Sequence, residues 1–551
     1  MCYTIVTVVY ALYVMAALRS VNGLGKYFNT TGLCDPELHY MVNIDRKLDE
    51  IQGLVEQGNY FVINRARQYG KTTTLNLLTE KLASEYTVFF ISFEGLGDTS
   101  YENSFSFCRS ICGLLCDTVL YGEVSDISEK LTDELIKRSS MDSQTTDFRT
   151  LSNLFSEICM TSQKPVVLVI DEVDQASNQA QFLAFLGMLR DKYLKRAKRP
   201  TFQSVILAGV YDIKNLKLKI REENEHRYNS PWNIAADFRV DMSFSADDIA
   251  GMLSEYEADH HTQTDIRMAA KMIYDYTAGY PFLVSRICKI IDEHILNGSR
   301  NQCWSKDIIL EAVRILLSEK NTLFESMINK LSDFPELRDM IHALLFIGKS
   351  IVYNPDNRAI DIAIMFGFAK VEDNLVVIAN RIFETRLYNM FLSSAELQNS
   401  TIYKASLQDK NQFIVNGFLN MDLVMAKFVQ HFTELYGDCQ ETFIEETGRR
   451  YFLLYLRPII NGTGNYYIES RTRDMRRTDV IIDYNGQQFI IEMKIWHGEE
   501  YNRKGEEQLL GYMRDYHLKK GYLLSFSFNK NKAVGITEHH FDEMCILEAV
   551  V

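Results

Sequence analysis

The chain has 551 residues, several times the size of one hydrophobic core, so three or four domains are expected. Apolar residues make up 46% and charged residues 24%, with 8 prolines, which excludes a long disordered tract. The formal charge of -14 excludes a uniformly basic coat for nucleic acid, because phosphate binding needs lysine and arginine. The 10 cysteines are too dilute for a disulfide scaffold and fit a reducing compartment.

Residues 1–25 form an apolar N-terminal extension in which an uncharged run ends before Arg19. The run lacks the basic start of a secretory signal, and it is shorter than the roughly 20 apolar residues of a membrane span. An unneeded extension or a misplaced start is the first interpretation, with a membrane anchor and a signal peptide as the alternatives, in that order. We expect the remainder of the chain to be cytoplasmic and to have no membrane partner.

Residues 26–240 predict one α/β domain. Apolar runs at 60–64, 88–93, 165–174 and 204–210 alternate with helical stretches, which is typical of a parallel sheet covered by helices on both faces. Cys108, Cys112 and Cys116 recur every fourth residue, so they are expected on one buried helical stripe rather than around a metal ion.

A phosphate-binding loop is predicted between the strand at 60–64 and the helix that follows. Such a loop needs a helix N-terminus, a lysine for the terminal phosphates and a hydroxyl for magnesium, and Gly70, Lys71 and Thr72 supply them in that place. Arg65 stands where the usual pattern has its first glycine.

The run VVLVIDEVD supplies the second half of the nucleotide site. It is a buried strand that ends in two carboxylates, of which Asp171 is expected to hold Mg²⁺ together with Thr72, and Glu172 to polarise the attacking water. The two motifs together predict ATP binding and hydrolysis.

Three further segments are expected after this domain. Residues 241–300 predict a helical lid, interrupted by the Gly-Tyr-Pro sequence at 279–281. Residues 301–400 predict a winged-helix-like module, because short helices precede two strands joined by a charged turn; the module either binds nucleic acid or packs against its neighbours. Residues 405–551 predict a separate α+β domain.

The stretch from Tyr40 through RARQYGKTTTL, with the later GYPFLVSR, resembles the AAA-ATPase-like family that is often fused to a PD-(D/E)XK nuclease domain in bacteria. That family carries an arginine-rich loop in place of the first glycine. The resemblance implies Arg65 or Arg67 near the phosphates, a polar sensor near Asp212, and Arg286 as a second sensor, for which a salt bridge is the alternative. The expected nucleotide-binding residues are Arg65, Arg67, Gly70, Lys71, Thr72, Thr73, Asp171 and Arg286.

The C-terminal hairpin TDVIIDYNGQQFIIEMKIW carries a second candidate site. Asn485-Gly486 predicts a type I′ turn that pairs Tyr484 with Gln487, so paired residue numbers sum to 971 and Asp479 faces Glu492. On that rung the Cα atoms lie about 4.5 Å apart, and two opposed carboxylates are stable only around a cation. Lys494 lies on the same face. We expect a Mg²⁺ or Mn²⁺ site; the alternative is a solvated sheet edge.

The spacing D-x12-E-x-K resembles the PD-(D/E)XK phosphodiesterase superfamily, with Thr478 in place of the proline. Gln508 and Tyr512 are similar to the Q-x3-Y helix of some members. Glu446, in preference to Glu445, matches the helical carboxylate, and the alternative for either glutamate is a charge at a helix N-terminus. The resemblance implies a restriction-endonuclease-like fold in which the catalytic residues are Asp479, Glu492, Lys494 and Gln508 and the metal ligands are Glu446, Asp479 and Glu492.

Arginines are concentrated between residues 449 and 478, where only Glu469 and Asp474 oppose them. The cluster is either a local nucleic-acid-binding patch or a solvated face. Its last four members lead into Asp479 and would hold a nucleic-acid backbone over that strand. The seven arginines are Arg449, Arg450, Arg457, Arg471, Arg473, Arg476 and Arg477.

These patterns predict a P-loop NTPase with a helical lid and a winged-helix-like module, joined to a restriction-endonuclease-like domain. The expected function is ATP binding and hydrolysis coupled to metal-dependent cleavage of nucleic acid, in the first place DNA. The alternative is an ATP-controlled nucleic-acid-binding switch with a non-cleaving nuclease fold. Whether the chain acts alone or as a homo-oligomer is left open.

Overall fold

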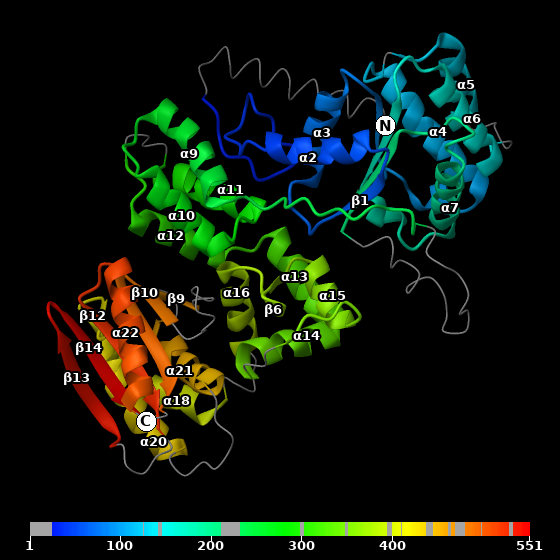
Figure 1. The fold of residues 1–551 in the computed structure, drawn as a ribbon. Helices are drawn as coiled ribbons and strands as arrows, with labels where there is room; N and C mark the ends of the chain where they lie inside the picture. The colour runs from blue at the N-terminus through cyan, green and yellow to red at the C-terminus, as the bar shows by residue number, and fades with distance from the viewer. Residues whose placement is uncertain are drawn as a thin grey trace.

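The computed structural model describes residues 25–124, 126–140, 146–210, 232–297, 302–347, 351–393, 399–408, 410–436, 445–460, 464–468, 480–496, 499–527 and 533–551. Figure 1 shows an N-terminal α/β unit, a helical region in the middle of the molecule, and a C-terminal sheet with helices that lies against the helical region. Among the described residues, no helix is both long enough and apolar enough to span a membrane.

The α/β unit is built on a parallel sheet in the order β1-β4-β3-β2. Its strands are β1 (Tyr60–Asn64), β2 (Thr87–Ser92), β3 (Val166–Asp171) and β4 (Ser204–Gly209). Every residue of β3 and β4 is buried, since helices cover both faces. The predicted parallel sheet is therefore confirmed, and Ala236 extends it past β1 through a parallel bridge to Phe61.

One face of this sheet packs against α2 (Asp45–Glu56) and α3 (Lys71–Leu82). The other face packs against α4 (Ser104–Leu120), α5 (Glu129–Ser139), α6 (Phe148–Thr161) and α7 (Ala180–Leu194). Cys108, Cys112 and Cys116 are all buried on α4, which confirms the predicted core stripe. Short 3-10 helices η1 (Asp98–Tyr101) and η2 (Val173–Ala176) follow β2 and β3.

The predicted lid consists of α9 (Ala246–His260), α10 (Ile266–Thr277) and α11 (Pro281–Lys289), which continues into a π-helix, η4 (Ile290–Ile295). Gly279 is required between α10 and α11, because its φ is 72° and a Cβ there would lie 1.9 Å from the carbonyl oxygen of Phe244. The predicted boundary at 300 assigns α12 (Lys306–Ser318) to the next module, but α12 packs against α10, α11 and η4.

Next come α13 (Thr322–Asp333), α14 (Pro335–His342), η5 (Ala343–Ile347) and α15 (Arg358–Met365). The hairpin of β5 (Ala369–Glu372) and β6 (Leu375–Ile378) follows, and then α16 (Arg381–Leu392). Asp373 and Asn374 both have positive φ, so the charged turn joins the strands as expected. The helices and hairpin are present, and the winged-helix assignment stays a prediction.

The C-terminal part contains a mixed sheet in the order β13-β14-β12-β11-β10-β9. β11, β12 and β14 are parallel to one another, and the other pairs are antiparallel. The strands are β9 (Gly464–Ile468), β10 (Val480–Tyr484), β11 (Gln487–Ile495), β12 (Lys520–Phe526), β13 (Gly535–Phe541) and β14 (Met544–Val550).

Helices lie around this sheet, and a small hairpin precedes it. They are α18 (Thr401–Gln408), α19 (Lys410–Phe413), α20 (Met421–Tyr436), α21 (Glu445–Ile460) and α22 (Glu499–Asp515), with β7 (Ile414–Val415) and β8 (Phe418–Leu419) forming the hairpin. One continuous apolar core runs from Phe28 through the lid to Val551. The lid, the middle module and the C-terminal sheet are therefore packed together.

Candidate functional site

The phosphate loop begins after β1 and ends at Gly70, which lies directly before the first turn of α3. Gly70 has a positive φ of 77°. Lys71 is 7% exposed, and its Nζ donates to the carbonyl oxygens of Arg65 (3.0 Å) and Ala66 (3.2 Å). Burial lowers the pKa of Lys71, and the charges of Asp174 and Glu172 oppose that shift. The ammonium group is thus held inside the loop and faces carboxylates.

Thr72 and Asp171 meet although they come from different elements. The Thr72 hydroxyl donates to Asp171 Oδ2 over 2.7 Å, and Asp171 is 2% exposed at the end of β3. The other oxygen, Asp171 Oδ1, accepts from the backbone N–H of Glu172. A hydroxyl and a carboxylate beside a helix N-terminus are the hard oxygen donors that Mg²⁺ prefers, so these residues fit the predicted ion.

Glu172 follows directly in a left-handed conformation, with φ 53°. Burial raises the pKa of its carboxyl, the neighbouring Asp171 raises it further, and Lys71 lowers it. A non-glycine residue held at positive φ is uncommon away from turns and functional sites. The structure therefore holds Glu172 in a fixed conformation beside the Thr72–Asp171 pair.

Asp174 was not among the predicted site residues. Its Oδ2 accepts from the backbone N–H of Val210 over 2.6 Å, and Gly209 leaves space for it, since a Cβ there would lie 2.8 Å from Oδ1. Among the acidic groups near Lys71, Asp174 has the largest effect on the lysine pKa. The sequence feature that could have indicated Asp174 is its place as the third carboxylate of the run DEVD.

A cavity of about 370 Å³ opens beside the phosphate loop. Three parts of the chain enclose it: the segment 29–47, the loop with the start of α3, and the lid. Thr73 lies in its wall, and the Thr73 Oγ1 accepts from the backbone N–H of Cys34. Aromatic and aliphatic side chains dominate the lining, which includes Tyr40, Met41, Val42, Ile44, Tyr69, Met242, Phe244, Pro281 and Phe282. Sequence patterns did not reveal this cavity, although the family resemblance begins at Tyr40.

The structure differs from the prediction at Arg65. Its guanidinium donates to the carbonyl oxygens of Asn64 (2.9 Å) and Val240 (2.7 Å) and lies over the ring of Phe238. Arg65 is therefore anchored to the chain beside β1 and is not presented to the loop. Arg67 is exposed in the loop, where a phosphate could reach it.

Arg286 forms a two-pronged ion pair with Glu319, at 3.1 Å from Nε and 2.5 Å from Nη2. This ion pair matches the salt-bridge alternative for Arg286. It occupies the guanidinium that a second sensor would need for contact with the nucleotide. Asp212 lies outside the described residues.

Residues at the ends of three helices approach the phosphate loop. Tyr280, at the start of α11, donates its hydroxyl to the carbonyl oxygen of Arg67 over 2.5 Å and packs edge-on against Tyr69. Gln68 donates to the Thr322 hydroxyl at the start of α13 over 3.0 Å. Gly367, which follows α15, lies so close that a Cβ there would come within 2.9 Å of the Ala66 Cβ. The Gly-Tyr-Pro sequence thus links the lid directly to the loop.

The second candidate site lies on β11, and its predicted register is confirmed. Tyr484 pairs with Gln487, and Val480 pairs with Ile491. Asp479 lies outside the described residues, as does the side chain of Glu446 at the start of α21.

Glu492 is fully buried and Lys494 is 3% exposed, with Lys494 Nζ 2.5 Å from Glu492 Oε1. β11 lies between β10 and β12, so the alternative of a solvated sheet edge is wrong. Helix α22 covers this face, since a Cβ at Gly505 would lie 3.3 Å from Lys494 Cγ. Gln508 is half-buried on the same helix.

Residues 37–386 match the AAA-like domain family, and this match spans well over half of the chain. The chain belongs to that family. Its AAA-like domain contains the parallel sheet, the phosphate loop, the lid and the middle module, whereas the C-terminal sheet lies beyond the match.

Several solved structures are similar to 61–65% of the chain. The Walker-type ATPase of Pyrococcus abyssi has 14% identity and a TM-score of 0.45, covering 65% of this chain and 99% of that one. The ORC2 protein of Aeropyrum pernix has 12% identity and a TM-score of 0.36, covering 63% and 94%. The RuvB branch migration motor of Thermotoga maritima has 12% identity and a TM-score of 0.30, covering 61% and 91%. No curated protein matches the chain.

The predicted arginine patch needs correction at two positions. Arg449 is 2% exposed inside the C-terminal part, and Arg457 donates to the Asn389 carbonyl (2.8 Å) and the Ser393 hydroxyl (2.7 Å) at the end of α16. Arg449 is therefore not available to a nucleic-acid backbone, and the Arg457 guanidinium is used to join α21 to the end of α16. The other members include Arg471, Arg473, Arg476 and Arg477, which lie outside the described residues.

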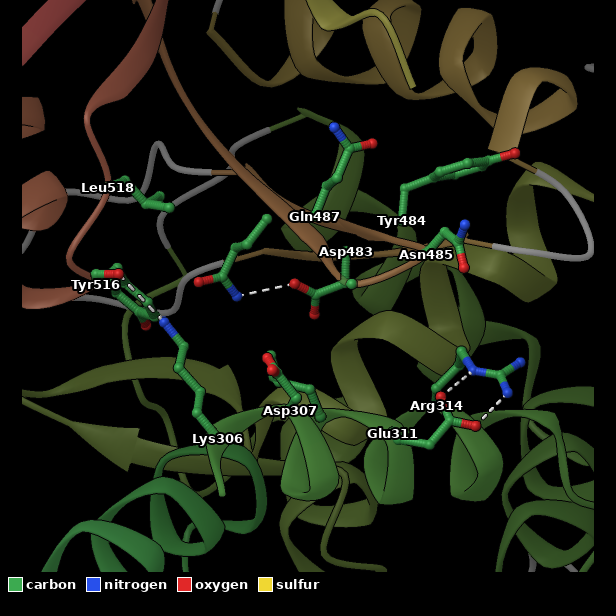
Figure 2. Close-up of a pocket in the computed structure, with 13 residues that line it drawn as sticks. Lys306, Asp307, Glu311, Arg314, Asp483, Tyr484, Asn485, Gln487, Tyr516 and Leu518 are labelled. Atoms are coloured by element: carbon green, nitrogen blue, oxygen red, sulfur yellow. Dashed lines mark hydrogen bonds and ion pairs between the residues drawn. The ribbon is translucent and has the colours of Figure 1, made fainter. Parts of the chain in front are cut away.

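A second cavity, of about 570 Å³, separates α12 of the AAA-like domain from the β10–β11 turn (Figure 2). Asp483 points into it, and Asp483 Oδ1 accepts from Gln488 Nε2 over 2.8 Å. Its Oδ2 is shielded from solvent and has no hydrogen-bond partner among the described residues. Burial raises the pKa of Asp483 to about 7, while Gln488 and Lys306 oppose the shift. This carboxyl is therefore a titratable group at the contact between the two parts of the chain.

Proposed function

We propose that the chain binds and hydrolyses ATP with Mg²⁺ in its AAA-like domain, and that its C-terminal domain is a metal-dependent nuclease of the PD-(D/E)XK type that acts on DNA. The contact between Thr72 and Asp171 carries the first half of this proposal. It brings a loop hydroxyl and a strand carboxylate together beside a buried lysine, which is the set of groups that a nucleoside triphosphate and its ion require.

In this proposal Lys71 leaves the loop carbonyls to contact the terminal phosphates, and the Gly70 turn presents backbone N–H groups to them. Magnesium at Thr72 and Asp171 neutralises phosphate charge. Glu172 orients the attacking water, a role that needs its carboxyl ionised, and the charge of Lys71 favours that form. The aromatic and aliphatic cavity next to the loop accommodates the base.

The buried pair of Glu492 and Lys494 supports the nuclease half. Burying a charged pair inside a sheet costs desolvation energy, which a functional role of the pair would explain, and both residues project from one face of an interior strand. β10 and β11 are paired from Val480 with Ile491 to Tyr484 with Gln487, and we predict that Asp479, which lies outside the described residues, pairs with Glu492. Glu492 and Asp479 then bind Mg²⁺ or Mn²⁺, and Lys494 stabilises charge that develops on the phosphate.

The second candidate is an ATP-controlled switch that binds nucleic acid without cutting it. The complete burial of Glu492 favours this alternative, because a catalytic ion needs access to the carboxylate that binds it. The two candidates differ in a single observable, phosphodiester cleavage.

The test uses the purified full chain with supercoiled plasmid, single-stranded DNA and single-stranded RNA, in Mg²⁺ or Mn²⁺, with and without ATP. Asp479→Ala and Lys494→Ala should abolish cleavage and leave ATP hydrolysis intact. Lys71→Ala should abolish hydrolysis of ATP. Lys519→Ala, which removes an exposed lysine from the same domain, is the matched control and should change neither activity.

Cleavage that survives Asp479→Ala or Lys494→Ala would refute the nuclease site. Absence of cleavage by the wild type on every substrate, together with ATP-dependent binding of DNA, would establish the switch. Unchanged ATP hydrolysis in Lys71→Ala would refute the nucleotide site, independently of either result.

A further inference from the structure

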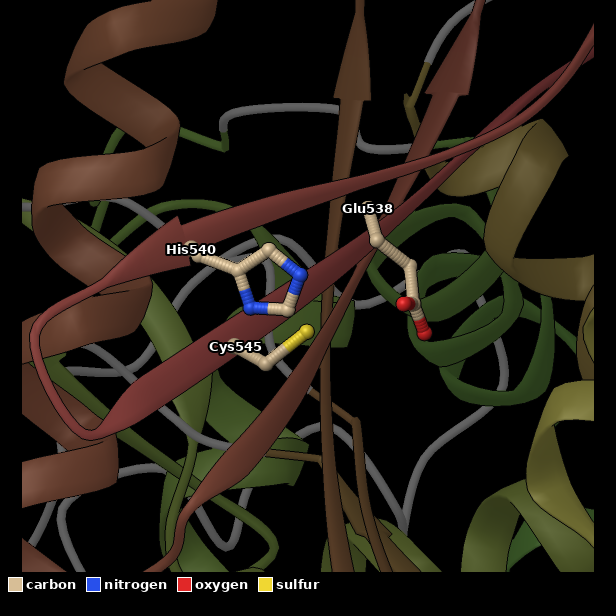
Figure 3. A group of neighbouring side chains, drawn as sticks. All are labelled: Glu538, His540 and Cys545. Atoms are coloured by element: carbon tan, nitrogen blue, oxygen red, sulfur yellow. The ribbon is translucent and has the colours of Figure 1, made fainter.

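The last two strands of the chain bring three potential metal ligands onto one face of the sheet. His540 on β13 pairs directly with Cys545 on β14, and Glu538 lies two residues before His540. Side chains of a strand alternate between faces, and directly paired residues share a face. Glu538, His540 and Cys545 therefore converge, and Figure 3 shows their three side chains gathered on the hairpin.

We propose that Glu538, His540 and Cys545 bind a thiolate-accepting transition-metal ion, with zinc as the first candidate. One carboxylate oxygen, one imidazole nitrogen and the sulfur all lie within 4.8 Å of one another. Ligands around tetrahedral zinc lie about 2.0–2.3 Å from the ion and so about 3.5 Å from each other. Small side-chain rotations on this hairpin bring the three atoms to that spacing.

The surroundings orient one ligand and leave the site accessible. Lys520 Nζ donates to Glu538 Oε1 and to Asp422 Oδ2 on α20, each over 2.8 Å. A carboxylate has two oxygens, so Glu538 can keep its contact with Lys520 and bind an ion through Oε2. Carboxylates that bind metal ions are commonly oriented by a hydrogen bond of this kind. Glu538 and His540 are exposed, so an ion can enter and water can fill a fourth position.

The donor set separates this site from the two magnesium-type sites. Nitrogen and sulfur donors favour zinc, cobalt and copper, whereas Mg²⁺ prefers oxygen. The pairing of strands also separates Cys545 from Glu492. Glu492 and Glu548 both pair with Leu523, so they lie on one face of the sheet. Cys545 is three residues before Glu548 on the same strand and therefore lies on the opposite face. The proposal is thus independent of nuclease activity.

The adjacent His539 offers a matched control. It faces the other side of the hairpin, where its Nε2 lies 3.4 Å from Glu548. His539→Ala and His540→Ala therefore remove the same side chain from neighbouring positions, and only the second removes a proposed ligand. Cys303, which is exposed ahead of α12, is the corresponding control for Cys545.

The experiment titrates the chelator-treated full chain with Co²⁺ in excess Mg²⁺ and records absorption spectra. The wild type should bind one Co²⁺ with a thiolate-to-cobalt charge-transfer band and tetrahedral d–d bands, and Zn²⁺ should displace it. His540→Ala and Cys545→Ser should lose these bands, and Glu538→Gln should weaken Co²⁺ binding at least tenfold. His539→Ala and Cys303→Ser should keep the wild-type spectrum.

Absence of the bands in the wild type would overturn the proposal, as would their persistence in Cys545→Ser or His540→Ala. Circular dichroism of each variant checks its folding. If Cys545→Ser fails to fold, His540→Ala decides the question, because its side chain is exposed and its removal leaves the core intact.

Discussion

Asp483→Asn should remove a pH-dependent penalty on the stability of the C-terminal part. The pKa of Asp483 is about 7, against about 3.9 for an ordinary aspartate, because burial disfavours its charged form. Gln488, Lys306 and Asp307 are the groups that face it. A shift of about three units corresponds to at most about 4 kcal/mol, and the partial exposure of the residue reduces this to about 2–3 kcal/mol.

The sign follows from the raised pKa of the folded state. The folded protein binds the proton more tightly than the unfolded chain does, so this contribution is fully present below about pH 4 and is lost as the pH rises through about 7. Asparagine keeps the acceptor for Gln488 and carries no charge. The gain in stability of the variant over the wild type should therefore be larger at pH 8 than at pH 5.

Differential scanning calorimetry at several pH values between 5 and 8.5 measures this difference. A gain of about 2–3 kcal/mol raises the Tm of the transition that includes the C-terminal part by roughly 4–10 °C at pH 8. Asp542→Asn, in the exposed β13–β14 turn, should show no pH-dependent difference from the wild type. A Tm difference for Asp483→Asn that is the same at pH 5 and pH 8 would refute the reasoning.

Three further substitutions test the AAA-like domain. Gly279→Ala places a Cβ against the Phe244 carbonyl at a positive φ and should destabilise the protein by at least about 3 kcal/mol, seen as a lower urea midpoint; an unchanged midpoint would contradict the close approach. Tyr280→Phe removes the hydrogen bond to the Arg67 carbonyl, so ATP affinity measured by calorimetry should fall a few-fold, at a cost of about 1 kcal/mol, and an unaltered Kd would show that the contact does not hold the loop. Glu172→Gln should keep ATP binding and lower phosphate release at least about 100-fold, whereas normal turnover would exclude Glu172 as the group that orients water.

Sequence patterns were sufficient where structure depends on neighbours along the chain. The buried strands were predictable because each is a short apolar run between helical stretches. The β10–β11 register was predictable because a two-residue turn at Asn485-Gly486 permits a single alignment of its strands. The Gly70-Lys71-Thr72 loop was predictable for the same reason, since a strand and a helix flank it directly.

Features that depend on distant contacts could not be read from the sequence. Arg65 binds a carbonyl 175 positions away, at Val240, and nothing near Arg65 indicates this partner. The apolar cavity needs walls from three separate segments, and Asp174 is positioned by the N–H that follows β4. His540 and Cys545 are close in sequence, but their common face follows only from the turn that joins β13 and β14.

The phosphate loop is in contact with the ends of three helices, and these contacts affect the rate at which the loop can rearrange. Tyr280, Thr322 and Gly367 each contact a different residue of the loop. A rearrangement of the loop must then displace the first turns of α11 and α13 and the end of α15 together. Nucleotide exchange becomes a collective movement of the middle of the chain, so amide hydrogen exchange in α13 should slow on ATP binding, although α13 lies outside the nucleotide cavity.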